Sequence, residues 1–188
     1  MKDIIENEFS EHIKTANLLY NLTDAIANAS QLCIDCLKNG GKILLFGNGG
    51  SAADAQHIAA ELVGRFKVDR KGLPAIALTT DTSALTSIGN DFGYEHIFSR
   101  QVDALANKRD VVIGISTSGK SSNVNSALKV ASKLNCTTIG FSGQGGGEMN
   151  NICDLNLVIP SMETPRIQES HIIIGHVICH IIDQEFKS

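Results

Sequence analysis

The sequence lacks the long hydrophobic run that a membrane protein needs. No apolar stretch in its 188 residues approaches the roughly 20 residues that cross a bilayer. Residues 1–10 are charged and lack the apolar core of a secretory signal peptide. A basic block is also missing, and the formal net charge of -4 disfavours a nucleic-acid surface. We therefore expect a cytoplasmic protein with no membrane partner and no nucleic-acid partner.

Cysteine is too scarce and too scattered for a disulfide framework. The chain has 5 cysteines, an odd number, which fits reduced thiols. Cys33 and Cys36 form a C-x-x-C pair in an apparently helical stretch, but no second pair accompanies them. We therefore expect buried small hydrophobes here rather than a metal knuckle.

The order of apolar runs indicates an α/β fold. Short apolar runs typical of buried strands occupy residues 43–46, 75–78, 111–115, 137–141 and 155–159. Helical candidates lie between them at residues 51–63, 82–88, 94–105 and 123–134. Because uninterrupted apolar strands alternate with helices, we predict a five-stranded parallel sheet with helices on both faces, a flavodoxin-like three-layer sandwich. With no long linker, residues 1–188 form one domain.

Both ends of the chain are predicted to be long helices. Residues 2–38 have helical periodicity and predict two helices joined near residues 21–24. A last helix runs from about residue 165 to residue 186, and it is more apolar than one packing face requires. We expect this helix and the helices of about residues 2–39 to be buried against other subunits.

A cluster of hydroxyl side chains follows the third predicted strand. Ser116, Thr117, Ser118 and Ser121 surround Gly119 directly before a predicted helix. Free backbone N–H groups and the positive end of the dipole make a helix start attractive to a phosphate. Serine is also a common N-cap without any ligand, and that alternative applies if the segment is taken alone.

A second loop supports the phosphate interpretation. Residues 46–54 follow the first strand and contain Gly47, Gly49 and Gly50, but they do not fit the dinucleotide fingerprint G-x-G-x-x-G. Ligands of open parallel sheets bind beyond the carboxyl ends of the strands. Two such loops at adjacent strand ends predict a pocket for a small sugar phosphate.

Ionisable residues recur at helical spacing in two predicted helices. His57 and Glu61 lie four residues apart, which suits a metal ion or a structural hydrogen bond. In the last helix, spacing favours His176 with His180 or with Glu169 as partners. A third polar segment, Asn90–Gly93, is expected to be a turn that either has no function or lines a pocket.

Six segments together resemble the phosphoheptose isomerases, members of the sugar isomerase (SIS) domain family. They are Gly47–Ser51, His57–Phe66, Gly89–Gly93, Ile97–Arg100, Gly114–Gly119 and Arg166–His171. They follow in order along essentially the whole chain. The hydroxyl loop alone indicates only an SIS domain, whereas H-x-x-x-E combined with R-I-Q-E and a later histidine is more specific.

The resemblance implies a set of site residues. Expected to bind substrate are Asn48, Gly49, Gly50, Ser51, Glu61, Asn90, Asp91, Ser116, Thr117, Ser118, Ser121 and Gln168. A zinc ion, one per subunit, would be held by His57, Glu61, Gln168 and His176. The resemblance thus selects Gln168 where helical spacing favoured His180. Lys120 departs from the asparagine that often follows this glycine.

The resemblance also implies an activity and an assembly. The expected reaction is aldose–ketose isomerisation of sedoheptulose 7-phosphate through an enediol, with Glu61 as base and His176 as acid, by a homotetramer. One alternative is a non-catalytic SIS-domain binding protein of the type that associates with the initiator DnaA. An isomerase for hexulose phosphates is another.

Overall fold

Five short apolar segments form the parallel sheet of the domain. The computed structural model describes residues 1–187. Its strands are β1 (Ile43–Gly47), β2 (Ala75–Ala77), β3 (Val111–Ser116), β4 (Thr137–Ser142) and β5 (Leu155–Val158). They are arranged in the order β2-β1-β3-β4-β5, and every neighbouring pair is parallel. The predicted sheet is confirmed, and its order places a topological switch point between β1 and β3.

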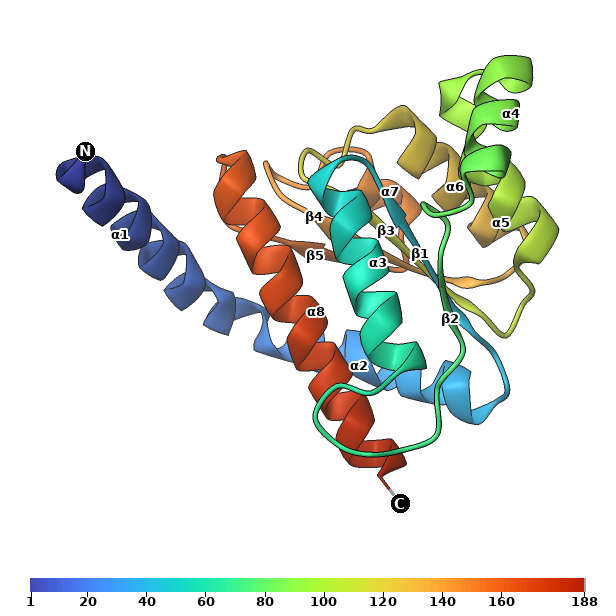
Figure 1. Ribbon diagram of the computed structural model, residues 1–188, viewed down its shortest axis with the longest axis horizontal. Coiled ribbons are helices and arrows are strands. Elements are labelled where there is room, and N and C mark those ends of the chain that lie inside the picture. The colour runs from blue at the N-terminus through green and yellow to red at the C-terminus, as the bar shows by residue number, and fades with distance from the viewer. Residues whose placement is uncertain (188) are drawn as a thin grey trace.

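Side chains of the central strands alternate between two hydrophobic cores. Ile43 and Leu45 of β1 join the core under α2 (Thr23–Lys38), α3 (Gly50–Val63) and α8 (Thr164–Phe186). Leu44 and Phe46 join the opposite core, under α4 (Thr82–Phe92), α5 (Ser99–Leu105) and α6 (Ser122–Lys133). Figure 1 shows α3 and α8 side by side on one face of the sheet and α4 to α6 on the other. The three-layer prediction is confirmed.

The first helix, α1 (Lys2–Leu18), projects away from these layers (Figure 1). A 3-10 turn over Leu19–Leu22 joins it to α2, as the predicted break near residues 21–24 requires. Arg166 of α8 donates to the backbone carbonyl and to the Oε2 of Glu8, each at 2.9 Å. His12 Nδ1 lies 2.9 Å from Glu169 Oε2. Polar contacts therefore tie α1 to α8, while the apolar side chains of α1 are exposed, namely Ile4, Ile5, Phe9 and Ile13.

Two local predictions are wrong. The expected helix over residues 94–105 is divided into a 3-10 turn (Tyr94–His96) and α5; the buried Phe98 between them stacks on Phe46 with ring centroids 5.2 Å apart. The expected turn at Asn90–Gly93 is instead the last turn of α4, which ends only where Gly93 takes a φ of 94°. The short helix α7 (Met149–Ile152) was not expected.

The expected burial of Cys33 and Cys36 as small hydrophobes is confirmed. All five thiols are free, and Cys33 and Cys36 are buried in the core. Burial raises the pKa of Cys36 to about 11, so this thiol is uncharged and packs as a small hydrophobe. Across residues 1–187, none of the helices combines the length and the apolar character that a membrane span requires.

Candidate functional site

Two loops meet at the carboxyl ends of β1 and β3. Asn48 follows β1, and Asn123 lies in the first turn of α6, which follows β3. Each side-chain amide donates to the other's oxygen over 2.9 Å. Beside this pair is a cavity of about 450 Å³ lined by Gly47, Asn48, Gly49, Ala52, Thr79, Leu85, Thr86, Gly89, Tyr94, Ile97 and Phe98. The glycine-rich loop therefore borders a space of the size that a small ligand needs.

The hydroxyl loop, residues 116–121, has the geometry of an anion cradle. Its turn is closed by the Gly119 N–H, which donates to the Ser116 carbonyl over 3.0 Å, and Gly119 takes a φ of 65°. The Ser116 and Ser121 hydroxyl oxygens are 2.9 Å apart. Thr117 and Ser118 are half-buried, and the side chain of Lys120 is exposed. The loop leads directly into α6, so its hydroxyls lie beside the free N–H groups of a helix start, and phosphate binding there stays a prediction.

Residues 114–121 also match G-x-x-x-x-G-K-[ST], a pattern that the sequence alone does not separate from a sugar-phosphate loop. In the structure, Gly114 is an interior residue of β3, paired with Phe46 and with Gly140. A Cβ atom there would lie 2.9 Å from Leu128 of α6. The strand continues through Ser116, so the loop is too short to wrap a triphosphate, and this arrangement disfavours a nucleoside triphosphate site.

A compact group of ligand-type atoms lies between α3 and α8. His57 Nε2 is 3.1 Å from Glu61 Oε1 and 3.2 Å from His176 Nε2. The donor atoms of the three residues all lie within 4.8 Å of one another. The Phe66 ring stacks on the His176 ring, with centroids 5.2 Å apart and planes at 15°, and this contact fixes the imidazole plane.

The chemistry of this group fits a zinc ion. Two histidines and one glutamate form a common catalytic zinc site, with a fourth position open to water or substrate. Zinc–nitrogen bonds of about 2.0–2.1 Å in tetrahedral geometry place two nitrogens roughly 3.3 Å apart. The nitrogens of His57 and His176 are 3.2 Å apart, close to that value.

Gln168 lies with the glycine-rich loop rather than with the three-residue group. A Cβ atom on Gly50 would lie 2.5 Å from the Gln168 amide nitrogen, so this side chain covers the start of α3. His57 is seven residues further along α3, roughly 10 Å at 1.5 Å per residue. Within one chain, the structure therefore brings together three of the four predicted ligands.

Helical spacing favoured His180 or Glu169 as the partner of His176, and both predictions are wrong. His180 Nδ1 lies 3.5 Å from Lys67 Nζ, because the segment after α3 runs beside the end of α8. Glu169 instead accepts from Arg166 over 2.6 Å and pairs with His12. His176 therefore joins neither of them.

The remaining predicted substrate residues lie around the loops. Ser51 is buried at the start of α3, where its N–H donates to the Asn48 carbonyl over 3.0 Å. Asn90 and Asp91 are exposed at the end of α4, and Asn90 Nδ2 donates to Asp91 Oδ1 over 2.8 Å. They lie directly after Gly89 of the cavity wall, so their contact with a ligand stays a prediction.

Sequence reasoning missed three residues near these loops. The sequence predicts Asn123 only as the first residue of a helix and Tyr94 only as part of a longer helix. Asp54, in α3, is half-buried, and no described residue within 1–187 hydrogen-bonds to its Oδ2. Burial raises the pKa of Asp54 to about 6, against an opposing effect of His57. None of these features has a signal in residue type or spacing.

The fold and the two loops define an α/β protein of the sugar isomerase class, and a family model described as an SIS domain matches residues 10–143. Phosphoheptose isomerase from Aliarcobacter butzleri is 61% identical over 188 residues, covering 100% of both chains. Phosphoheptose isomerase 1 from Campylobacter jejuni is 60% identical over 186 residues, covering 99% of this chain and 100% of that one.

The solved structure of phosphoheptose isomerase GmhA from Neisseria gonorrhoeae superposes with a TM-score of 0.93 at 45% identity, covering 97% of this chain and 98% of that one. The chain belongs to the phosphoheptose isomerase family. The resemblance inferred from six segments is thereby confirmed over the full length.

Proposed function

We propose that this chain is the aldose–ketose isomerase that converts sedoheptulose 7-phosphate to D-glycero-D-manno-heptose 7-phosphate, the first step towards bacterial nucleotide-activated heptose. The observation that carries the proposal is that a chain 61% identical to a phosphoheptose isomerase over 188 residues has both the hydroxyl loop and the His57–Glu61–His176 group. The DnaA-associating alternative is not favoured. A non-catalytic binding protein would not need the His57–Glu61–His176 group in addition to the hydroxyl loop.

The phosphate is assigned to the hydroxyl loop. Ser116, Thr117, Ser118 and Ser121 offer donors beside the start of α6, and no acidic side chain lies in the loop to oppose an anion. Binding energy at this end positions the reacting carbons at the other end of the sugar.

Proton transfer is assigned to Glu61 and His176. Isomerisation moves a proton between C1 and C2 and needs a base at carbon and an acid at oxygen. Glu61 Oε1 faces His57, which leaves the second carboxylate oxygen to take the carbon-bound proton. His176 Nε2 also faces His57, so the Nδ1 of His176 is the atom left to exchange a proton with a substrate oxygen.

The zinc ion is part of the proposal. His57, Glu61 and His176 would hold it, and the fourth position would be open to water, to substrate or to the amide of Gln168, which the family resemblance also selects as a ligand. When bound, zinc would polarise the substrate carbonyl and stabilise negative charge on its oxygen.

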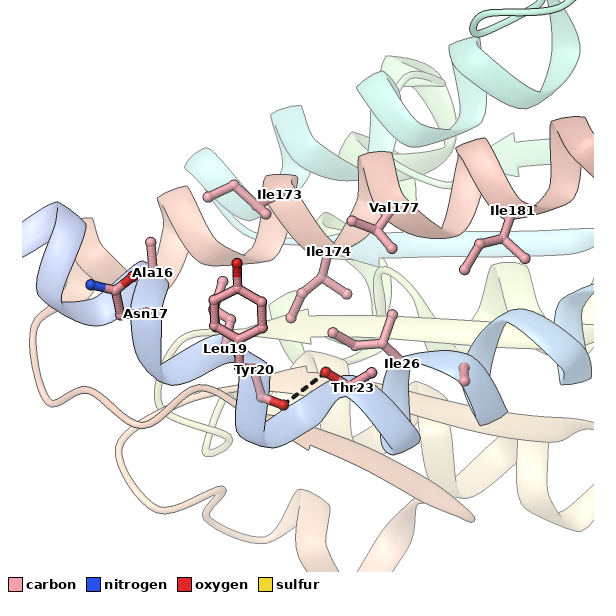
Figure 2. A pocket seen from close by; sticks show the side chains of 11 residues that line it. Ala16, Asn17, Leu19, Tyr20, Thr23, Ile26, Ile173, Ile174, Val177 and Ile181 are labelled. Atoms are coloured by element: carbon pink, nitrogen blue, oxygen red, sulfur yellow. Dashed lines mark hydrogen bonds between the residues drawn. The ribbon is translucent and has the colours of Figure 1, made fainter.

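We further propose a cytoplasmic homotetramer. Apart from the polar loops, the chain has an apolar pocket of about 480 Å³ between the α1–α2 junction and α8. Figure 2 shows Ile173, Ile174, Val177 and Ile181 of α8 along one wall and Tyr20 and Ile26 opposite them. This pocket and the exposed apolar stripe of α1 support burial of both surfaces between subunits.

The decisive experiment replaces Glu61. The purified, zinc-loaded protein should convert sedoheptulose 7-phosphate, and Glu61→Gln should reduce both turnover and exchange of the C1 proton at least about 100-fold. Glu185→Gln, the same change at an exposed position far along α8, should leave both unchanged. Bound zinc is measured in each variant.

Three results would count against the proposal. Near-normal turnover of Glu61→Gln with metal retained removes Glu61 from the chemistry. Absence of conversion by the zinc-supplied wild type favours a binding protein. Faster conversion of a hexulose phosphate in a panel of chain lengths assigns a different substrate.

A further inference from the structure

Asn48, in the wall of the 450 Å³ cavity, is held by side chains from two other segments. Its Nδ2 donates to Asn123 Oδ1, and its Oδ1 accepts from Asn123 Nδ2, each over 2.9 Å. The hydroxyl of Tyr94 donates to the same Oδ1 over 3.1 Å. Asn123 is buried, whereas Tyr94 lines the cavity with Asn48.

A backbone group sets the direction of this network. A reciprocal amide pair would be equally satisfied if both amides were flipped together. The N–H of Val124, however, donates to Asn123 Oδ1 over 2.9 Å, and a backbone N–H can only donate. This bond fixes which end of the Asn123 amide is oxygen. The orientation of the Asn48 amide follows from it, and Tyr94 reinforces that orientation.

The orientation leaves Asn48 with a single unused group. An amide oxygen accepts two hydrogen bonds, and Asn48 Oδ1 already has two donors, Asn123 and Tyr94. An amide nitrogen has two hydrogens, and one of them is donated to Asn123. Asn48 can therefore offer a ligand one N–H donor and no acceptor.

We infer that Asn123 and Tyr94 are positioning residues that make Asn48 a fixed hydrogen-bond donor to a substrate oxygen, a hydroxyl or carbonyl of the sugar. This inference rests on the proposed function for the identity of the substrate. The pair also joins the loop after β1 to the first turn of α6. The same bonds thus fix the distance between the glycine-rich loop and the hydroxyl loop.

A double-mutant cycle tests the inference. Tyr94→Phe should weaken binding of sedoheptulose 7-phosphate about 3- to 10-fold, the effect of one hydrogen bond, with a matching rise in KM and little change in kcat. In an Asn48→Ala background, the same Tyr94→Phe change should have no effect, because the amide that Tyr94 positions is gone; a remaining effect would assign Tyr94 a contact of its own with the substrate and overturn the positioning role. Binding is measured by calorimetry and turnover by appearance of the aldose.

Two further variants sharpen the test. Ser132→Ala, which also removes one hydroxyl but at an exposed position late in α6, should bind like wild type. Asn123→Ala removes both bonds to Asn48 without adding a charge beside the hydroxyl loop, and it should weaken binding at least as much as Tyr94→Phe. Circular dichroism melting checks that each variant is folded.

The outcomes separate this inference from the proposed function. Additive effects of Tyr94→Phe and Asn48→Ala, or a Tyr94→Phe protein that binds like wild type, overturn the positioning role. A wild type that binds the sugar phosphate without converting it contradicts the proposed function alone. The double-mutant cycle is then evaluated from the binding constants of the four proteins.

Discussion

His171 should make the stability of this protein depend on pH in the mildly acidic range. The side chain is fully buried in α8, and its Nε2 lies 3.1 Å from the Ser142 carbonyl. A carbonyl only accepts, so Nε2 carries the hydrogen of the neutral ring. Nδ1 has no hydrogen-bond partner among residues 1–187. Burial therefore lowers the pKa of His171 from 6.5 to about 4, although the bond to Ser142 opposes this shift.

The sign follows from the two pKa values. Between pH 6.5 and about pH 4, the unfolded chain binds a proton at His171 that the folded chain does not bind. The free energy of unfolding therefore falls as the pH falls through this range. The loss from this one residue is about 2 kcal/mol at pH 5 and approaches about 3 kcal/mol below pH 4.

Urea unfolding at pH 7.5 and pH 5.0, at one fixed protein concentration, measures the effect. His171→Gln keeps an N–H donor for the Ser142 carbonyl but does not titrate. Its loss of stability between the two pH values should be about 2 kcal/mol smaller than that of wild type. His96→Gln, a matched change at a more exposed histidine, should retain the wild-type loss. Equal losses in wild type and His171→Gln would refute the reasoning.

Three other substitutions have definite expected outcomes. Asp183→Asn leaves the buried Arg70 guanidinium, which bonds to Asp183 Oδ1 over 2.7 Å, without its counter-charge, and it should lower the free energy of unfolding by about 3 kcal/mol in urea titrations. A loss below about 1 kcal/mol would contradict this. Gly119→Ala places a Cβ on the Gly146 carbonyl at a φ of 65°, so we expect about 1–3 kcal/mol of destabilisation together with a raised KM. An unchanged KM would show that the loop tolerates the shift. Lys120→Asn should raise KM less than about 5-fold, because the cation is exposed, and the effect should shrink with added salt. A salt-independent effect would assign Lys120 a direct contact.

The sheet and the loops could be predicted because their signals are local. Each buried strand is a short apolar run, and the hydroxyl cluster of residues 116–121 lies directly before a helix. Even the alternation of β1 between two cores follows from a period of two residues. Which histidine of α8 joins His57 and Glu61 was harder to predict, since His176 and His180 lie one helical turn apart on the same helix and spacing favoured them as a pair.

Tertiary contacts decided what the sequence pattern left open or misjudged. His180 is turned towards Lys67, a residue of the segment after α3, and no helical period encodes that segment's path. The break between the 3-10 turn and α5 falls beside Phe98, whose ring stacks on Phe46 from a strand about 50 residues earlier in the chain, a contact that residue pattern does not reveal. Asn123 became visible as a functional candidate only when its partner, 75 residues earlier, was seen beside it.

The parallel packing of α3 and α8 couples two distant parts of the molecule. Gly50 meets Gln168 at one level, and His57 meets His176 further along the same two helices. At the second level, Gly175 packs on Ile58 so closely that a Cβ atom would lie 2.6 Å from it. A single small residue thus sets the sliding register of one helix on the other. A side chain added there would shift the glycine-rich loop and the His57–Glu61–His176 group together, because both are carried by the same pair of helices.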